Sequence, residues 1–555
     1  MNTGDESMGR AGVSRREWLH LTAYGAAAAA LPGSLRAATS DVGDPAAAWP
    51  QENGPFGNFN PRRYGVKLVE DLAQAKQAWV SEEHDLGFAK GSSSGYLSHL
   101  ADATTHPGSA SGLIVAEGKV FASSFRPCGE VWADQSPHVL AGIGKFRGEQ
   151  LEAIRRNAAL DADDFTLAVD VRTGKTVWKT VEANQGLNRY SGKRLQFHGT
   201  PVYHDGRVLS LGSTGRVYCY DAGTGKKLWE DATSSPAQAA AALKTKLLKA
   251  RNALPGGEGM GASPIVAGGV LVVPQFGTKH DVGLRGMNVK TGETLWEVPA
   301  ATSRFATPAV WTHRDKQFVL VATIQGELRL IDPQDGRVLW TVTGLEPVYY
   351  PLSPSDNHVM VNVKSATDTA KKPGQSWGRI AAYHLTPAGA ERAWEVPDLA
   401  PFWFENHMDI CAMRRVLIRD ERVYYFTQGH THDPQRSSCY FHILEEETGT
   451  ILYSSQAEEF GHPTTDNPQN GILGQFWLVE DRMLNIPDAA HSDRSTLQWV
   501  TIDPKQVRRL GSRWKPPHHN TTAYEKFIEL AYVDGRFLMR TWQGQVVCYD
   551  LRRPV

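Results

Sequence analysis

Short runs of alternating apolar and polar residues recur along the chain, and each run ends at a turn signal. The run Val217 to Tyr220 is a clear example, and the turn Thr224-Gly225 follows it. Alternation with a period of two is the pattern of a β-strand. Glycine tolerates the positive φ that reverses the chain in a tight turn. The pattern therefore predicts many short antiparallel strands rather than helices.

One phrase follows these strands repeatedly: Asp or Asn, two residues, Thr-Gly with a charged residue, two residues, and Trp. Clear copies end at Trp178, Trp229, Trp296 and Trp340, and weaker copies at Trp394, Tyr453 and Trp514. A second turn signal lies upstream of most copies, at Glu117-Gly118, Asp205-Gly206, Gly268-Gly269, Asp420-Glu421 and Asp534-Gly535. Each unit is then four short strands, which is a propeller blade, and we expect the tryptophans to fill the wedge between neighbouring sheets.

The ring is also expected to close. The last repeat, from about Phe527 to Arg552, supplies three strands, and residues 74–81 repeat the Lys-x-x-Trp spacing with Lys76 and Trp79. We interpret residues 74–81 as the outer strand of the last blade, which leaves fewer exposed sheet edges. The prediction is an all-β, eight-bladed β-propeller of four-stranded antiparallel blades, closed by an N-terminal strand, with seven blades as the alternative.

The phrases from Asp170 to Trp178 and from Asp221 to Trp229 resemble the repeat of PQQ-like, quinoprotein-type propellers, and the resemblance covers roughly residues 74–555. Such repeats occur in quinone-dependent alcohol dehydrogenases and in a non-catalytic outer-membrane assembly factor. The resemblance implies that a dehydrogenase would place a vicinal disulfide against PQQ, a Trp beneath it, and a Glu/Asn/Asp calcium site beside a catalytic Asp. All five cysteines are isolated: Cys128, Cys219, Cys411, Cys439 and Cys548. PQQ is therefore disfavoured as the cofactor.

The N-terminus resembles an export signal. Arg15 and Arg16 precede an alanine-rich apolar run and then small residues near Ala38, which is the order of a twin-arginine signal peptide. The predicted organisation is a signal peptide at residues 1–39, a strap at 40–73 and the propeller at 74–555. The expected location is periplasmic or otherwise extracytoplasmic.

Charge and hydropathy narrow the possible partners. The chain has 555 residues, with 59 Lys and Arg against 60 Asp and Glu, so the formal net charge is -1. This balance gives no electrostatic reason to expect nucleic acid. The chain contains no run of eighteen apolar residues, so the sequence predicts no membrane-spanning helix. A small-molecule or oligosaccharide ligand is the expected partner.

The two faces of the predicted propeller differ. One face, here called the turn face, carries the short turns. The other, the loop face, carries the loops between second and third strands and between blades, including residues 126–164, 231–260, 364–378 and 428–437. Functional residues concentrate on loops held by a rigid scaffold, so the loop face is the candidate working surface.

Histidines gather on the predicted loop face, mainly in the C-terminal half. The candidate metal ligands for a divalent ion are Gln428, His430, His432 and His491. The candidate catalytic residues are His407, His462 and Tyr190, and the candidate substrate-binding residues are Arg126, Arg189, Arg304, Trp403 and Tyr349. The Gln-x-His-x-His run at 428–432 also resembles the metal-binding run of oligogalacturonate lyases, which are propellers too.

Three functions follow as hypotheses. The leading one is a metal-assisted enzyme that acts on a sugar or uronate-containing saccharide in a funnel of these histidines. The second is a PQQ-dependent alcohol or sugar dehydrogenase. The third is a non-catalytic binding or assembly scaffold, because a fold alone does not determine a function.

Overall fold

The fold comes from a computed structural model of the chain. It describes residues 48–87, 101, 106, 108–129, 144–157, 159, 161–188, 196–197, 199–231, 261–275, 281–303, 306–348, 350–363, 379–397, 416–427, 440–456, 475–486, 496–518, 530–541 and 544–554. The chain divides into two compact units, Met1–Val42 and Gly43–Val555, and the described residues belong to the second.

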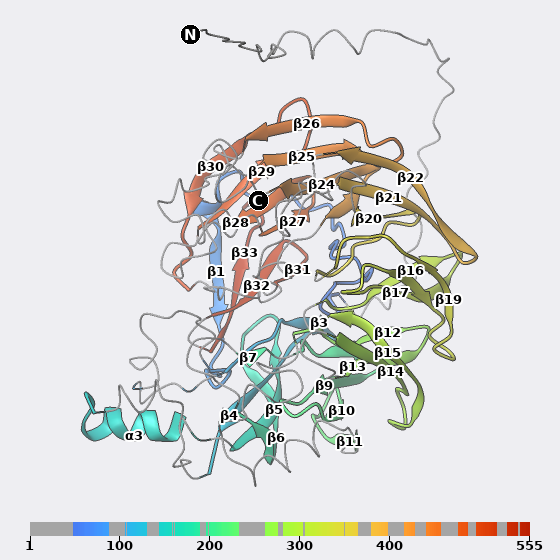
Figure 1. The fold of residues 1–555 in the computed structure, drawn as a ribbon. Coiled ribbons are helices and arrows are strands. Elements are labelled where there is room, and N and C mark those ends of the chain that lie inside the picture. The colour runs from blue at the N-terminus through green and yellow to red at the C-terminus, as the bar shows by residue number, and fades with distance from the viewer. Residues whose placement is uncertain are drawn as a thin grey trace, which may run out of the picture. The chain divides into compact units, whose positions relative to one another are not determined.

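Eight antiparallel sheets form the blades of a β-propeller, as the repeat predicts (Figure 1). Blade 1 contains β3 (Ile114–Ala116), β4 (Lys119–Pro127), β5 (Asp161–Asp170) and β6 (Thr176–Leu187). Blade 2 contains β8 (Val202–His204), β9 (Arg207–Leu211), β10 (Val217–Asp221) and β11 (Lys227–Asp231). Blade 3 contains β12 (Ile265–Ala267), β13 (Val270–Gln275), β14 (Asp281–Asn288) and β15 (Thr294–Ser303). Blade 4 contains β16 (Ala309–His313), β17 (Lys316–Ala322), β18 (Leu328–Ile331) and β19 (Val338–Val342).

The second half of the ring continues the pattern. Blade 5 has three strands in the described residues, β20 (His358–Val363), β21 (Arg379–Thr386) and β22 (Gly389–Pro397). Blade 6 contains β23 (Leu417–Arg419), β24 (Arg422–Thr427), β25 (Tyr440–Glu445) and β26 (Ile451–Gln456). Blade 7 contains β27 (Gln475–Val479), β28 (Arg482–Ile486), β29 (Leu497–Thr501) and β30 (Arg509–Trp514). Blade 8 contains β31 (Ala531–Val533), β32 (Arg536–Arg540) and β33 (Val546–Asp550), with β1 (Lys76–Val80) as its fourth strand.

The ring closes through the N-terminal strand, which confirms that prediction. β1 pairs antiparallel with β33, from Lys76 opposite Asp550 to Val80 opposite Val547, with a shift of register between Gln77 and Trp79. In Figure 1, the blue β1 lies beside the red β33 although they are far apart in sequence. The prediction of eight blades is confirmed, and the alternative of seven is wrong.

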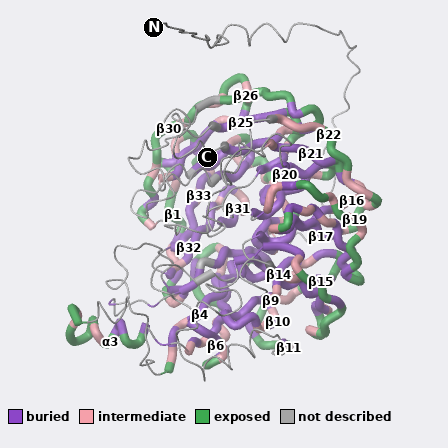
Figure 2. The backbone as a smooth tube through the Cα atoms, viewed as in Figure 1, coloured by how far each residue is buried: buried purple, intermediate pink, exposed green. Residues whose placement is uncertain are grey.

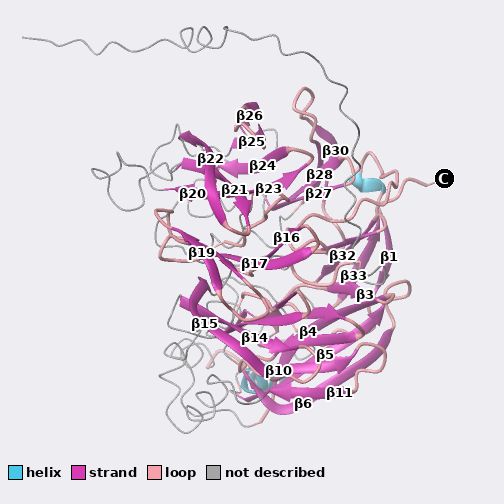
Figure 3. Ribbon diagram, turned by 90° about the vertical axis from the view of Figure 1, so that its right-hand side faces the viewer, coloured by secondary structure: helices cyan, strands magenta, loops and turns pink. Residues whose placement is uncertain are grey.

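In the part of the chain that the structure describes, few residues outside the blades have regular structure. Two further short strands, β2 (Ser109–Ala110) and β7 (Gln196–Phe197), pair in parallel. Helix α3 (Gly148–Asn157) lies within the long loop of blade 1, and the 3-10 helix η2 (Leu72–Gln74) precedes β1 (Figure 3). Neither helix was predicted from the sequence. Among the described residues, no helix has the length and apolar character needed to cross a membrane.

The repeated phrase has a specific role at the seams between blades. Six of these tryptophans donate the indole Nε1–H to a backbone carbonyl in the next blade, at 2.7–3.0 Å. The pairs are Trp79–Val171, Trp178–Ala222, Trp229–Val289, Trp296–Pro333, Trp340–Thr386 and Trp394–Glu446. Clusters of buried side chains fill the seams, while outer strands such as β19 and β26 are partly or fully exposed (Figure 2). The tryptophans therefore join blades as well as filling the wedge.

The glycine of the phrase is needed for two reasons. Gly225 has φ +72°, which favours glycine. A Cβ added there would lie 2.5 Å from the ring of Trp178, and Gly174 stands in the same relation to Trp79. The turn must therefore lack a side chain so that the indole of the preceding blade can lie on it.

The strap, residues 48–73, contacts all eight blades. The backbone of Trp49 pairs with that of Val115 in blade 1. From there the strap meets blades 2 to 8 in order, through Tyr203, Val266, Pro308, Pro354, Ile418, Glu480 and Leu551. Trp49 and Phe59 are fully buried. The strap thus links blades that are distant in sequence.

Hydroxyl side chains just before the inner strands form a second link. The amide of Gly112 donates to Thr200 Oγ1 at 2.8 Å, the amide of Thr200 to Ser263 Oγ at 2.8 Å, and the amide of Ser263 to Thr307 Oγ1 at 2.9 Å. The Thr307 hydroxyl then donates to the carboxylate of Glu52 in the strap. Blades 1 to 4 are joined to the strap by this chain of hydrogen bonds.

Candidate functional site

Arg126 is the predicted site residue that the structure describes. The remaining eleven lie outside the described residues: Gln428, His430, His432, His491, His407, His462, Tyr190, Arg189, Arg304, Trp403 and Tyr349. Their roles, and the funnel they would form, stay predictions. The site is therefore built outward from Arg126.

Arg126 lies near the loop-face end of β4, opposite Asp163 of β5. Its Nη1 donates to Asp85 Oδ2 at 3.0 Å, and its Nη2 lies 3.4 Å from Asp163 Oδ2. The side chain stays 42% exposed, so the two carboxylates orient the guanidinium at the surface without covering it.

Asp85 is the centre of a charged cluster at the seam between blades 8 and 1. It lies in the segment that follows β1, and it also accepts from Lys179 Nζ at 2.5 Å and from His106 Nε2 at 2.8 Å. Lys179 reaches Glu83 at 3.2 Å as well, and its ammonium lies 4.8 Å from the centre of the Phe165 ring. We call Glu83, Asp85, His106, Arg126, Asp163 and Lys179 the seam cluster.

The electrostatics of the seam cluster hold Asp85 in its charged form. Burial by itself raises the pKa of this carboxyl, but hydrogen bonds from His106 and Lys179 and their charges outweigh burial. The pKa therefore lies well below its ordinary value. The carboxylates of Glu83, Asp85 and Asp163 thus face the cations of Arg126 and Lys179, and His106 donates to Asp85.

This arrangement suits hydroxyl groups better than anions. Carboxylates accept and the guanidinium donates, in orientations fixed by their mutual contacts. The charge of Arg126 is already shared by two carboxylates, so little of it remains for an anionic substrate. The bond from His106 Nε2 to Asp85 orients the imidazole ring, which is nearly buried.

A buried carboxyl next to the seam cluster was missed from the sequence. Asp164 follows Asp163 in β5, but its side chain turns toward blade 2, where Oδ1 accepts from Ser213 Oγ at 2.6 Å and Oδ2 lies 3.3 Å from the Tyr218 hydroxyl. Burial raises its pKa to about 6, although the hydrogen bonds from Ser213 and Tyr218 oppose the rise. The sequence did contain a signal for this buried carboxyl: the adjacent pair Asp163-Asp164 in a strand that is otherwise mainly apolar.

A buried arginine is the second residue that sequence reasoning missed. Arg540, at the loop-face end of β32, has no exposed surface. It donates to Ser111 Oγ at 2.9 Å and to the carbonyl of Leu86, and its contact with Ser124 is 3.3 Å. Burial lowers its pKa to about 9. Because Leu86 is adjacent to Asp85, Arg540 supports the backbone that carries the seam cluster.

The cysteines do not fit a PQQ site of the dehydrogenase type. Cys219 and Cys548 are fully buried in β10 and β33, and burial raises the pKa of each thiol to about 12. Cys128 follows β4, and no two of the five cysteines are adjacent. These two buried cysteines are core residues, and the vicinal pair that the resemblance requires does not exist.

A metal site cannot be assembled from the described residues alone. No group of three or more His, Cys, Asp or Glu side chains in that part of the chain is arranged to hold a metal ion. The predicted ligands Gln428, His430, His432 and His491 lie elsewhere. The divalent-metal prediction therefore remains a proposal.

A known protein family matches the part of the chain that carries the clearest copies of the repeat. Residues 163–348 match the family model described as outer membrane protein assembly factor BamB. No curated protein matches the chain.

Three solved structures are similar at low identity. BamB from Moraxella catarrhalis has 13% identity and a TM-score of 0.43, covering 70% of this chain and 90% of its own. A europium-containing methanol dehydrogenase has 13% identity and a TM-score of 0.39, covering 80% and 90%. Quinohemoprotein alcohol dehydrogenase from Comamonas testosteroni has 12% identity and a TM-score of 0.39, covering 92% and 82%. Likenesses at this level assign no activity to the chain.

The matched region begins in β5 and runs through blades 2, 3 and 4, where the Trp-to-carbonyl seams are clearest. The family match and the repeated phrase agree on the same residues. Residues 163–348 therefore carry a PQQ-like repeat, and the eight blades make the fold a β-propeller.

Proposed function

We propose that this chain is an extracytoplasmic β-propeller that binds a neutral saccharide on its loop face and acts on it with the histidines of the long loops. The observation that carries the proposal is the seam cluster. Separate chain segments bring Asp85, His106, Arg126 and Lys179 together on the face that bears the long loops.

The proposal narrows the substrate from saccharides in general to neutral ones. A sugar hydroxyl both donates and accepts, and the seam cluster offers oriented acceptors beside the half-exposed guanidinium of Arg126. The charge of Arg126 is already shared by Asp85 and Asp163, which disfavours a uronate carboxylate at this point. Trp403, Tyr190 and Tyr349 are the residues proposed to stack on sugar rings.

The chemistry is proposed from the sequence pattern of the loops. Gln428, His430, His432 and His491 would hold a divalent ion that orients the saccharide, and His407, His462 or Tyr190 would transfer a proton. Metal analysis of the purified protein tests this part. Retained metal that is lost in His430→Ala and His432→Ala supports it, whereas a metal-free protein that still converts saccharide refutes it.

Binding is tested separately from chemistry. The full chain is applied to an array of immobilised neutral and uronate-containing oligosaccharides, beside Arg126→Ala and the control Arg172→Ala. Arg172 lies in the turn after β5, and its side chain is 80% exposed. We expect binding to neutral glycans that weakens in Arg126→Ala alone. Absence of any glycan binding, or a preference for uronates, would contradict the proposal.

A binding or assembly scaffold is the second candidate. The match of residues 163–348 to the model of an outer membrane protein assembly factor favours it. It predicts a protein partner that co-purifies after cross-linking in cells and stays bound in His430→Ala and His432→Ala. A partner lost with those histidines would count against a scaffold that is independent of the loop chemistry.

A further inference from the structure

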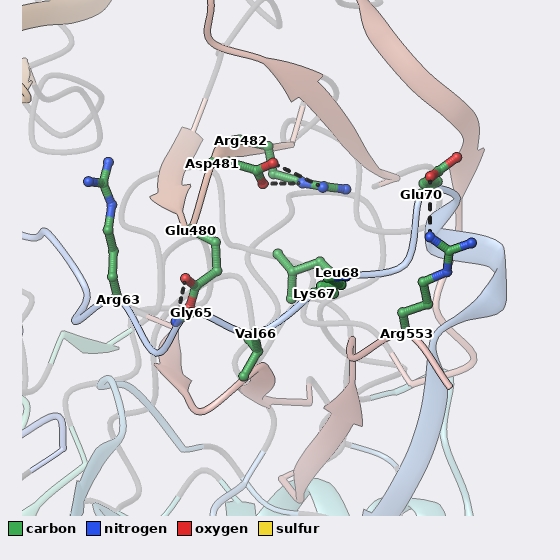
Figure 4. Close-up of a pocket in the computed structure, with 10 residues that line it drawn as sticks. All are labelled: Arg63, Gly65, Val66, Lys67, Leu68, Glu70, Glu480, Asp481, Arg482 and Arg553. Carbon is green, nitrogen blue, oxygen red and sulfur yellow. Dashed lines mark hydrogen bonds and ion pairs between the residues drawn. The ribbon is translucent and has the colours of Figure 1, made fainter. Parts of the chain in front are cut away.

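Blade 7 and the strap form a pocket on the turn face in which most charges are paired. Strap residues 63–70, the turn between β27 and β28, and Arg553 line a cavity of about 540 Å³ (Figure 4). Arg553 lies 3.8 Å from Glu70, and Arg482 Nε donates to Asp481 Oδ1 at 2.8 Å. The pocket therefore gives little reason to expect a charged ligand inside it.

The outer strand of the same blade carries cations that lack such partners. In β30 and the turn before it, Lys505, Arg508, Arg509 and Arg513 are exposed. None of the four forms an ion pair with another residue for which the structure gives a position. Lys515 adds a fifth exposed cation just after the strand. We call these five residues the basic rim.

Cations on other outer strands lie close to carboxylates. In blade 2, Lys227 Nζ lies 2.6 Å from a carboxylate oxygen of Glu230. In blade 5, Arg392 donates to Glu395 at 2.7 Å. In blade 1, Lys179 reaches the carboxylates of the seam cluster. Strand β30 differs from these strands because it has two arginines and no carboxylate.

Three carboxylates lie near the basic rim, and they do not cancel its charge. Asp503 is in the turn and accepts from the amide of Lys505 at 3.0 Å. The strap passes β30 at Asp71, which lies against Gly511, and Glu70 precedes it in the pocket. With all three counted against the five cations, two formal positive charges remain. The basic rim is thus a local positive patch on a chain whose net charge is -1.

The backbone holds the basic rim in a defined shape. In the turn, the amide of Arg508 donates to Thr501 Oγ1 at 2.9 Å, and the amide of Thr501 donates to the carbonyl of Arg508 at 3.0 Å. Gly511 has φ +64°, and the register between β29 and β30 shifts around it, as in a β-bulge. Trp514 anchors the strand edge-on against Tyr549 of blade 8, with ring centres 4.9 Å apart.

The arrangement of the basic rim favours an extended anionic surface as its ligand. The cations follow the outermost strand of blade 7, at the edge of the molecule (Figure 1, Figure 2). A small anion would meet only one or two of them. The mobile headgroups of an anionic bilayer can meet all of them, and arginine pairs with phosphate through two parallel hydrogen bonds. Each basic residue close to such a surface strengthens binding.

We propose that the basic rim binds peripherally to a membrane surface that contains anionic phospholipid. Lipid phosphates pair with Arg508, Arg509 and Arg513, while Lys505 and Lys515 add to the attraction. The occupant is chosen by charge complementarity with an exposed strand whose cations have no carboxylate in the same strand. The inference does not rest on the saccharide proposal, because the seam cluster shares no residue with the basic rim.

Co-sedimentation of the full chain with vesicles tests the proposal. The vesicles contain phosphatidylcholine alone or phosphatidylcholine with phosphatidylglycerol, at low and high salt. We expect binding to the anionic vesicles only, and weaker binding at high salt because salt screens exposed charges. The double variant Arg508→Gln, Arg509→Gln should weaken partitioning about thirtyfold, and Arg513→Gln alone about fivefold.

Two further double variants serve as matched controls. Arg172→Gln with Lys175→Gln removes the same charge from two exposed cations in blade 1 and should leave vesicle binding unchanged. Arg508→Lys with Arg509→Lys keeps the charge of the basic rim and should retain most of the binding. Thermal unfolding of each variant verifies that a loss of binding is not a loss of the fold.

Several outcomes would overturn the inference. They are no binding to anionic vesicles, equal binding to neutral vesicles, and equal loss in the blade 1 control. Binding of a fluorescent DNA duplex or a polyglutamate peptide without binding to vesicles would also overturn it, because the ligand would then be a soluble polyanion. Glycan binding should not change in Arg508→Gln, Arg509→Gln, so the two proposals can fail independently.

Discussion

The indole Nε1 of Trp79 donates a 3.0 Å hydrogen bond to the carbonyl oxygen of Val171, and this bond spans the seam between the last and first blades. The same relation joins Trp178 to Ala222 between blades 1 and 2. Ring closure thus uses the contact that joins ordinary neighbours, with the N-terminal strand supplying the tryptophan that blade 8 would otherwise lack.

Two glycine variants distinguish the steric effect of the indole from the cost of positive φ. Gly225→Ala places a Cβ against the Trp178 ring at positive φ, whereas Gly118→Ala has a similar φ of +68° and nothing within 4 Å. We expect about 1 kcal/mol of destabilisation for Gly118→Ala and roughly 2–4 kcal/mol for Gly225→Ala, because overpacking adds to strain. Denaturant unfolding of both variants measures the difference. Equal losses would show that the indole does not require the bare turn.

Asp164 should make the protein less stable as pH rises from about 4 to 6. Its folded pKa of about 6 lies above its ordinary value of 3.8, so the folded state favours the protonated form. The stability from protonation is complete below the unfolded pKa and is lost as pH rises through the folded pKa, by on the order of 3 kcal/mol. Asp164→Asn should remove this part of the pH dependence in urea unfolding. Parallel stability profiles for the two proteins would contradict the assignment.

Asp85 should act in the opposite direction at lower pH. Its folded pKa is depressed, so the stability it contributes is present above its unfolded pKa and is lost as pH falls through the folded one. The destabilisation caused by Asp85→Asn should therefore be largest near neutral pH and shrink below about pH 4. Thermal unfolding of both proteins across this range checks the trend. A difference that stays constant with pH would mean that the carboxylate charge does not hold the seam cluster.

The repeat determined most of what could be predicted about the fold. Strand alternation, paired turn residues such as Asp205 and Gly206, and spaced tryptophans are local signals, and each coincides with a strand, a turn or a seam. The Ser-Pro and Thr-Pro pairs before the inner strands, as at Ser263 and Thr307, were visible but not used. They mark the hydroxyls that link blades 1 to 4.

The site could not be predicted to the same depth because it is assembled from distant segments. Arg126 was predicted as a binding residue, but its partner Asp85 lies forty-one residues away, beyond the strand that closes the ring. Arg540 comes from the other end of the chain. No local pattern relates these residues until the ring has closed.

We propose that the guanidinium of Arg126 binds a saccharide on the loop face. The most direct measurement is calorimetric titration of a neutral oligosaccharide, taken from the array, into the unmodified chain, Arg126→Ala and Arg172→Ala. Loss of a charged hydrogen bond is worth roughly 1.5–3 kcal/mol, so we expect affinity to fall more than about tenfold in Arg126→Ala and to stay unchanged in Arg172→Ala. Equal affinity in all three proteins would contradict the account.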